Sequence, residues 1–287
     1  VGFVLCAVLG LTLSDFYFRS QTDVEEIIQM GNQYLMIVMG ASFGAFGQMM
    51  LERLLQGTGH SILSMYTQGA GAIINIILDP IFIFVFKLGV AGAAIATVLA
   101  QAVSVVLSLL IIRRRSLPFI MKREDIRFDK TVIGRIVKLG SPVALQDLLV
   151  NISFLVIIAI ANHMGTIPSA GVGVAEKLCG FVMMVPSAYG QSMTAFVAQN
   201  VGASREDRAR RVLLYGVLSS LAAGLVMCWG TFFHGDVLTG IFAKDTEVIA
   251  AAAEYLKAYA IDCLLTSFLF CFIGYFNGHG RTLFVMA

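Results

Sequence analysis

The sequence is dominated by apolar runs that are each long enough to cross a lipid bilayer. A transmembrane helix needs about 20 mostly apolar residues, and this chain is 58% hydrophobic and only 13% charged. Because lipid offers the backbone no hydrogen-bond partners, runs of this length are expected to be helical. We therefore predict an all-α, polytopic membrane protein with about eight spans, near residues 1–18, 30–51, 62–86, 90–112, 142–162, 172–197, 210–233 and 248–276.

One passage of the chain recurs at a constant offset. Tyr34-Leu35 and Gly57–Gly59 return as Tyr255-Leu256 and Gly278–Gly280, and the differences 255 − 34 and 278 − 57 are equal. Each copy is a whole apolar span that follows acidic residues and ends in Gly-x-Gly. Internally repeated membrane domains are common in secondary transporters, whose binding sites lie near the repeat interface. Transport is therefore the leading hypothesis.

The longest polar segment, residues 113–138, predicts the orientation of the chain. It carries nine Lys or Arg residues against three acidic ones, and such an excess marks a cytoplasmic loop. The other loops are alternately poor and rich in Lys and Arg, as this orientation requires. Both repeat copies therefore run from outside to inside, and the repeats are parallel. We expect an amino-terminal lobe over 1–112, a cytoplasmic linker over 113–138 and a carboxy-terminal lobe over 139–287. Within the linker, 120–136 is either an amphipathic helix on the membrane surface or a solvated loop.

Asp79 is the first candidate for an ion-binding residue. A carboxylate at the bilayer centre costs about 2.5–3.5 kcal/mol, so it usually faces a protein interior or a watery cavity. Asn75 lies one helical turn earlier on the same face, and Thr97 lies at a similar depth in the next span. Pro80 lacks an N–H, and its ring should kink the helix and free the carbonyl of Ile76. This oxygen-rich pocket suits a proton or Na⁺, and the alternative is a structural polar cluster between two helices.

Five residues are secondary candidates for ion binding: Asp147, Asn151, Glu176, Glu254 and Asp262. Asp262 falls near the middle of the last span, with Glu254 on a similar face, but Lys257 lies between them and could pair with either. Glu176 could instead extend to the membrane interface beside Lys177. Asp147 and Asn151 follow Pro142 close to the expected cytoplasmic surface.

Other polar residues have structural interpretations. Glu52 and Arg53 are interpreted as a local ion pair or an interface anchor. The four histidines stand alone near span ends, the five cysteines fall singly in apolar stretches, and no HExxH, CxxC or GxSxG motif occurs. We expect neither an enzyme nor a cofactor, and no metal site unless Asp79 binds Na⁺. Nothing indicates nucleic-acid binding. The expected partners are a small organic, often cationic, substrate and membrane lipid, and we expect a monomer in the plasma membrane.

Four segments together resemble the multidrug and toxic compound extrusion (MATE) family, in a superfamily that also contains polysaccharide flippases. They are residues 54–59, 75–80, 89–97 and 199–203. The resemblance implies two lobes of six helices, of which this chain holds helices three to ten as part of a longer protein. The constant offset between the two copies fits helix four recurring as helix ten.

The resemblance also implies site residues. In some relatives, an amino-lobe cation site uses an Asn and an Asp on helix five and a Thr on helix six, which match Asn75, Asp79 and Thr97; an Asp on helix one completes it and would lie upstream of this chain. Another branch uses acidic residues on helices seven and ten, with Asp147 and Asp262 as approximate counterparts.

The resulting hypothesis is an antiporter coupled to H⁺ or Na⁺ that exports organic substrates by alternating access of two lobes. A flippase for a lipid-linked substrate is the first alternative, and it would favour a cavity with several cationic residues. The spans contain few of these, chiefly Lys177 and Lys257. The second alternative is a non-transporting membrane scaffold, which would tolerate neutral replacements of Asp79 and Asp262.

Overall fold

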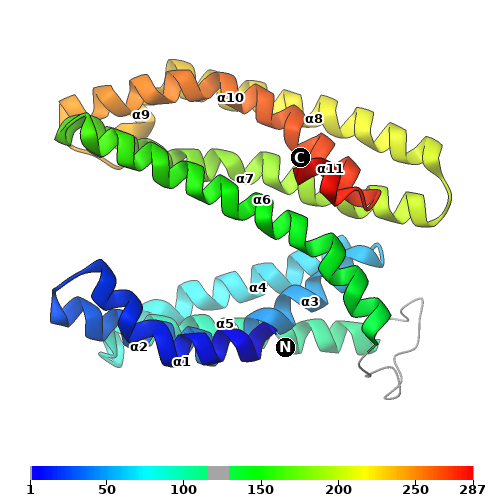
Figure 1. Ribbon diagram of the computed structural model, residues 1–287, viewed down its shortest axis with the longest axis horizontal. Helices are drawn as coiled ribbons and strands as arrows, with labels where there is room; N and C mark the ends of the chain where they lie inside the picture. The colour runs from blue at the N-terminus through cyan, green and yellow to red at the C-terminus, as the bar shows by residue number, and fades with distance from the viewer. Residues whose placement is uncertain (1, 115–128, 287) are drawn as a thin grey trace. The chain divides into compact units, whose positions relative to one another are not determined.

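The computed structural model describes residues 2–114 and 129–286, and the elements in these two ranges are all helical. Figure 1 traces them in chain order: α1 (Gly2–Gln21), α2 (Glu25–Gly40), α3 (Phe43–Gly57), α4 (Ser61–Pro80), the π-helix η1 (Ile81–Val85), α5 (Gly89–Arg114), α6 (Lys130–His163), α7 (Thr166–Gly202), α8 (Glu206–Phe233), α9 (Gly235–Gly240), α10 (Thr246–Gly278) and α11 (Thr282–Met286).

The helices have the length and composition of membrane spans. Within the described ranges, seven spans qualify by length and hydropathy, or eight if the bent pair of α2 and α3 forms one span. Large apolar side chains are widely exposed, including Ile76 at 71%, Phe84 at 74% and Trp229 at 58%, as expected where helices face lipid rather than water. The prediction of an all-α, multi-pass membrane protein is therefore confirmed.

The chain divides into two compact units, Val1–Asp125 and Ile126–Ala287. Of the predicted linker, residues 115–128 lie outside the described residues, and with them most of the predicted amphipathic stretch. The remainder of that stretch differs from the prediction, because Lys130 begins α6 and this helix continues without a break into the predicted span. The Asp129 carboxylate caps α6 by accepting hydrogen bonds from the main-chain N–H groups of Thr131 and Val132, at 2.8 and 3.3 Å.

In the first unit, the predicted continuous span over 30–51 is a bent pair of helices. α2 and α3 meet at an angle of 48°, and the helical hydrogen bonding tightens at the junction, where Ser42 N donates to Met39 O and Gly44 N to Ala41 O. Glycine is a weak helix former, and Gly40 and Gly44 flank this junction. An added Cβ at Gly44 would already touch Gln101 of α5 at 3.6 Å. The two glycines therefore weaken the helix where it bends, and an alanine at Gly44 would make only an ordinary van der Waals contact with α5.

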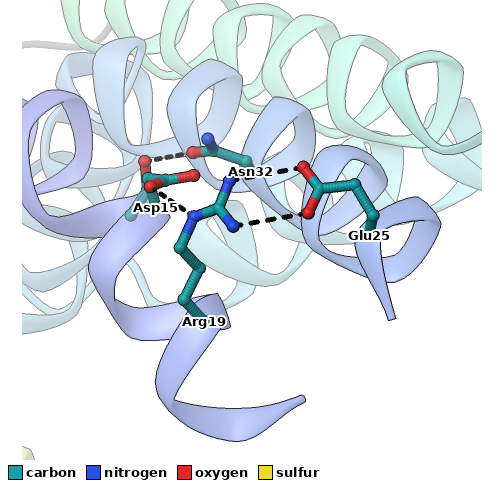
Figure 2. Close-up of polar contacts among 5 residues, drawn as sticks. Asp15, Arg19, Glu25 and Asn32 are labelled. Carbon is teal, nitrogen blue, oxygen red and sulfur yellow. Dashed lines mark hydrogen bonds and ion pairs between the residues drawn. The ribbon is translucent and has the colours of Figure 1, made fainter. Parts of the chain in front are cut away.

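Charged side chains join α1 to α2 at the end of the unit that is expected to face outside. Figure 2 shows Arg19 between two carboxylates: its Nε donates to Asp15 at 2.9 Å, and its two terminal nitrogens donate to Glu25 at 3.3 Å each. Nearby, the hydroxyl of the buried Ser14 donates to Asn32. The Arg19 ion pairs are about half exposed, so they are expected to add little stability.

Pro80 ends α4, and the five-residue π-helix η1 follows it directly. The N–H of Phe86 donates to the carbonyl of Ile81 at 3.0 Å, five residues earlier, as in a π-turn. Since proline has no N–H and crowds the preceding turn, the regular α-helical pattern ends there. The expected disturbance at Pro80 is thus a change of helix type.

In the second unit, α7 and α10 pack side by side in parallel (Figure 1). A Cβ added at Gly171 would meet Ala251, and one added at Gly278 would meet Val197. The numbers of the partners differ by nearly the same amount in both pairs (251 − 171 and 278 − 197), and a constant difference means that the two helices run in the same direction. Small residues on this seam allow the close approach of the helices.

The sequence repeat is also a repeat of backbone geometry. His60 N donates to Leu55 O at 2.8 Å, and Arg281 N donates to Phe276 O at 2.9 Å. Gly59 and Gly280 have φ values of +84° and +72°, as in the Schellman motif that ends many helices. The next helices, α4 and α11, begin at Ser61 and Thr282, which are separated by the same offset as the two Gly-x-Gly turns.

Candidate ion-binding site

Asn75 and Asp79 are in direct contact on α4. The Nδ2 of Asn75 donates to Oδ1 of Asp79 at 3.1 Å, because the two residues are one helical turn apart on the same face. Both side chains are partly buried. The pair lies just before the junction between α4 and η1, and such π-turns are frequent at functional sites.

Thr97 lies at the level of this pair on α5. A Cβ on Gly71 would meet Ser104, and a Cβ on Gly92 would meet Phe82. Residues that face each other in an antiparallel pair of helices have residue numbers with a nearly constant sum, which is 175 and 174 for these two pairs. In this antiparallel hairpin, Thr97 is therefore opposite residues 77–78, between Asn75 and Asp79. Its hydroxyl donates to the carbonyl of Ala93 at 2.9 Å. No hydrogen bond joins it to either residue of the pair among the residues that the structure describes.

The three residues offer the right atoms for a small cation. A carboxylate, an amide and a hydroxyl supply oxygen ligands of the kind that hard cations prefer, and a proton needs only one carboxylate oxygen. The amide of Asn75 donates to an oxygen of Asp79, and after rotation it could offer its own oxygen to a bound ion. The arrangement can therefore hold either a proton or a cation ligated by oxygen.

Sequence reasoning missed a buried carboxylate on α3. Only 7% of Glu52 is exposed, and its two oxygens accept hydrogen bonds from the Nε2 atoms of Gln48, at 2.9 Å, and Gln68 of α4, at 3.1 Å. The interpretation of Glu52 as an interface anchor was therefore wrong. The signal in the sequence was the spacing of Gln48, Glu52 and Gln56, which lie four residues apart and share one helix face.

In the second unit, Glu176 of α7 lies opposite Leu256 of α10 in the register of the seam, and Asp262 is six residues further along α10 (262 − 256). The side chains of Glu176 and Asp262 are both partly buried. The Oε1 of Glu176 is buried without a hydrogen-bond partner in the described part of the chain. This burial does not fit a side chain that extends to the membrane interface, so that interpretation of Glu176 is corrected.

The remaining candidates are exposed. Glu254 and Lys257 both lie on the outside of α10, and within the described ranges no ion pair joins Lys257 to Glu254 or to Asp262. Asp147 and Asn151 are exposed on α6, where the Nδ2 of Asn151 donates to the main-chain oxygen of Asp147 at 2.7 Å. Of the five secondary candidates, Glu176 and Asp262 are therefore partly buried, and the other three are exposed.

Among residues 2–114 and 129–286, no group of three or more His, Cys, Asp or Glu side chains is placed to hold a metal ion.

The MatE family model matches residues 2–81 and 142–287. The probable multidrug resistance protein YoeA of Bacillus subtilis is 27% identical over 260 residues, covering 88% of this chain and 56% of that protein. The multidrug export protein MepA of Staphylococcus saprophyticus is 28% identical over 239 residues, covering 83% and 53%. The chain thus spans little more than half the length of these relatives.

Solved structures share the fold. An outward-facing multidrug resistance MATE family transporter of the MOP superfamily matches with a TM-score of 0.88 and 21% identity, covering 99% of this chain and 65% of that one. A MOP superfamily transporter from Pyrococcus furiosus matches with a TM-score of 0.89 and 20% identity, covering 99% and 66%. Because the family model matches most of this chain, the chain belongs to the MatE family.

Proposed function

We propose that the whole protein is an antiporter that uses a gradient of H⁺ or Na⁺ to export small organic cations across the plasma membrane. The observation that carries the proposal is the contact between Asn75 and Asp79, at 3.1 Å, in a partly buried hairpin of two membrane spans. Membership of the MatE family supports it, as do relatives described as multidrug resistance and multidrug export proteins. The activity is transport, with no chemical change of the substrate.

Asp79 would couple the ion to the conformational change through its charge. A carboxylate in a poorly hydrated site is costly when charged, and a bound proton or Na⁺ removes that cost. A conformation that desolvates Asp79 is therefore favoured when the ion is bound, and one that hydrates it is favoured when the ion has left. Asn75 and Thr97 would adjust to both forms, because an amide and a hydroxyl can each donate or accept.

Export follows if the ion and the substrate favour different arrangements of the two lobes. Coupling requires that each ligand binds the two states with different affinity, since a ligand that binds both equally shifts nothing. Alternating access then exchanges an ion that moves inward for an organic cation that moves outward. The junction between α4 and η1 supplies irregular backbone beside Asp79, where a local rearrangement disturbs few regular helical hydrogen bonds.

The proposal is tested with ethidium efflux from proteoliposomes that contain the whole protein. Wild type, Asp79→Asn and Glu26→Gln are compared under imposed Na⁺ and H⁺ gradients in turn. Glu26 is an exposed carboxylate in α2, so its variant is the matched control. We expect efflux under one gradient in wild type and in the control, and its loss in Asp79→Asn. Efflux by Asp79→Asn at the wild-type rate would refute the role of Asp79. Correctly inserted wild type without efflux under either gradient would favour the flippase.

A further inference from the structure

Glu52 is a buried carboxylate that the proposed mechanism does not yet use. It is 7% exposed, and both of its oxygens are held by neutral side-chain amides, those of Gln48 and Gln68. A buried charge supported mainly by neutral donors is destabilising unless it can be neutralised. The charged and titratable residues on α1, α3, α4 and α5 and in the turn after α3 are otherwise Cys6, Asp15, Tyr17, Arg19, Arg53, His60, Tyr66, Asp79, Arg113 and Arg114.

The repeat indicates that the fold does not require a carboxylate at this position. The offset that relates Gly57 to Gly278 also relates Glu52 to Ile273 and Gln48 to Leu269. α10 therefore forms the same helix end with apolar residues at both positions. Since an apolar side chain satisfies the architecture, the carboxylate in the first unit calls for a functional explanation.

Polar residues recur on one face of α4 between Gln68, the partner of Glu52, and the candidate site. Ser64, Gln68, Asn75 and Asp79 follow one another at spacings of four, seven and four residues, which places them on one face of the helix. Eleven residues of helix separate Gln68 from Asp79 (79 − 68), a distance of about 16 Å. At the far end of this face, Gln56 of α3 donates to the Ser64 hydroxyl at 3.2 Å.

α5 contributes a second polar face to the same hairpin. Thr97, Gln101, Ser104 and Ser108 are spaced by four, three and four residues and so share one side of the helix. Ser104 is fully buried against Gly71, and its hydroxyl donates to the carbonyl of Thr67 at 3.1 Å. The hydroxyl of the buried Ser108 has no hydrogen-bond partner in the described part of the chain. Polar side chains therefore recur along the α4–α5 hairpin between the level of Asp79 and the level of Glu52.

We propose that Glu52 is a second proton-binding residue of the first unit, on the expected cytoplasmic side of Asp79, through which the coupling proton is released to the cytoplasm. The inference rests on the proposed function and specifies its ion as H⁺. It follows from a buried carboxylate between two neutral amides, at the inner end of a polar face that begins at Asp79.

The two glutamines suit a proton better than a metal cation. When Glu52 is charged, both amides present N–H groups to it, as in this structure. When Glu52 binds a proton, rotation of one amide presents an oxygen that accepts the new O–H. The contact between α3 and α4 is thereby kept in both protonation states. A sodium ion would instead need several oxygen ligands where N–H donors now lie.

The test uses the whole protein in liposomes with wild type, Glu52→Gln, Gln68→Leu and the control Glu26→Gln. Glutamine keeps the shape of Glu52 and can still hydrogen-bond to both amides, so we expect unchanged melting temperature and ethidium binding. Proton-driven ethidium efflux by Glu52→Gln should fall about tenfold or more, within the usual range of coupling between sites. Gln68→Leu removes one of the two amides but keeps the carboxylate and Gln48, so it should lower the melting temperature more than Glu52→Gln does and lower proton-driven efflux less.

Infrared difference spectra on acidification provide a readout that does not depend on transport. Wild type should show the band of a carboxyl group that becomes protonated, and Glu52→Gln should lack part of that band. An unchanged band, or wild-type efflux by Glu52→Gln, would overturn the inference and leave the role of Asp79 intact. Equal losses of efflux and stability in Glu52→Gln and Gln68→Leu would assign Glu52 a purely structural role. Wild type without gradient-driven efflux would refute the proposed function instead, and the infrared comparison alone would then decide whether Glu52 binds a proton.

Discussion

Asn75 donates a hydrogen bond to Asp79 across one turn of α4, at 3.1 Å, immediately before the chain changes from α-helix to π-helix. The amide also offers an oxygen to a bound ion if it rotates. Substitution of either Asn75 or Asp79 is therefore expected to change how the site binds its ion.

Replacing Asn75 by Leu should weaken coupling without preventing insertion. The variant removes a donor from a partly buried carboxylate, and a hydrogen bond to a charged group contributes about 1.5–3 kcal/mol. We expect the ion dependence of ethidium efflux to shift by about tenfold, measured as the ion concentration at half-maximal rate. Ile76→Leu, one residue along and exposed to 71%, is the control. An unshifted ion dependence in Asn75→Leu would contradict the coupling role of this bond.

Alanine substitutions at two glycines of α4 should have different effects on thermal stability. A Cβ at Gly71 would overlap the Oγ of Ser104 and lie 3.4 Å from Ala100 O, so Gly71→Ala should disrupt the packing of α4 on α5. A Cβ at Gly69 would meet nothing within 4 Å. At such an open helical position, alanine stabilises the helix by up to about 1 kcal/mol relative to glycine. Thermal unfolding in detergent should show a lower melting temperature for Gly71→Ala and an equal or higher one for Gly69→Ala. Equal effects would show that the hairpin is packed differently.

The positive φ angles at helix ends provide a further paired prediction. Ser204, after α7, has φ +57°, and Gly59, after α3, has φ +84° with open space around it. A left-handed conformation costs a residue with a Cβ about 1–2 kcal/mol. Ser204→Gly should therefore raise the melting temperature, while Gly59→Ala should lower it through backbone strain alone. A destabilised Ser204→Gly variant would mean that its hydroxyl contributes more than the strain costs.

The spans and the repeat could be predicted from the sequence because lipid allows few alternatives. Long apolar runs become helices, and the Gly-x-Gly turns at Gly59 and Gly280 fix the helix ends. The contact between Asn75 and Asp79 was also predictable, since a spacing of four residues places two side chains on one face.

Contacts between helices were harder to predict. Glu52 was misinterpreted because its partner Gln68 lies on another helix, and its neighbour Arg53 suggested a simpler pair. The burial of Glu176 depends on how α7 packs against α10, which periodicity does not determine. The bend between α2 and α3 lies beside Gly40 and Gly44, and glycine weakens a helix without deciding whether it bends.

An apolar replacement of Glu176 should raise stability and, if Glu176 takes part in coupling, reduce transport. Its Oε1 is buried without a partner in the described part of the chain, in the seam that also holds Asp262. An unsatisfied buried polar group costs about 1–3 kcal/mol, and an apolar replacement of similar shape removes that cost. Glu176→Met should therefore raise the melting temperature, with Lys177→Met on the exposed side as the control. If Glu176 takes part in coupling, the stabilised variant should lose gradient-driven ethidium efflux, as expected where function retains an unfavourable group. A variant that is more stable and fully active would remove Glu176 from the candidate ion-binding residues and leave Asp262 alone in that seam.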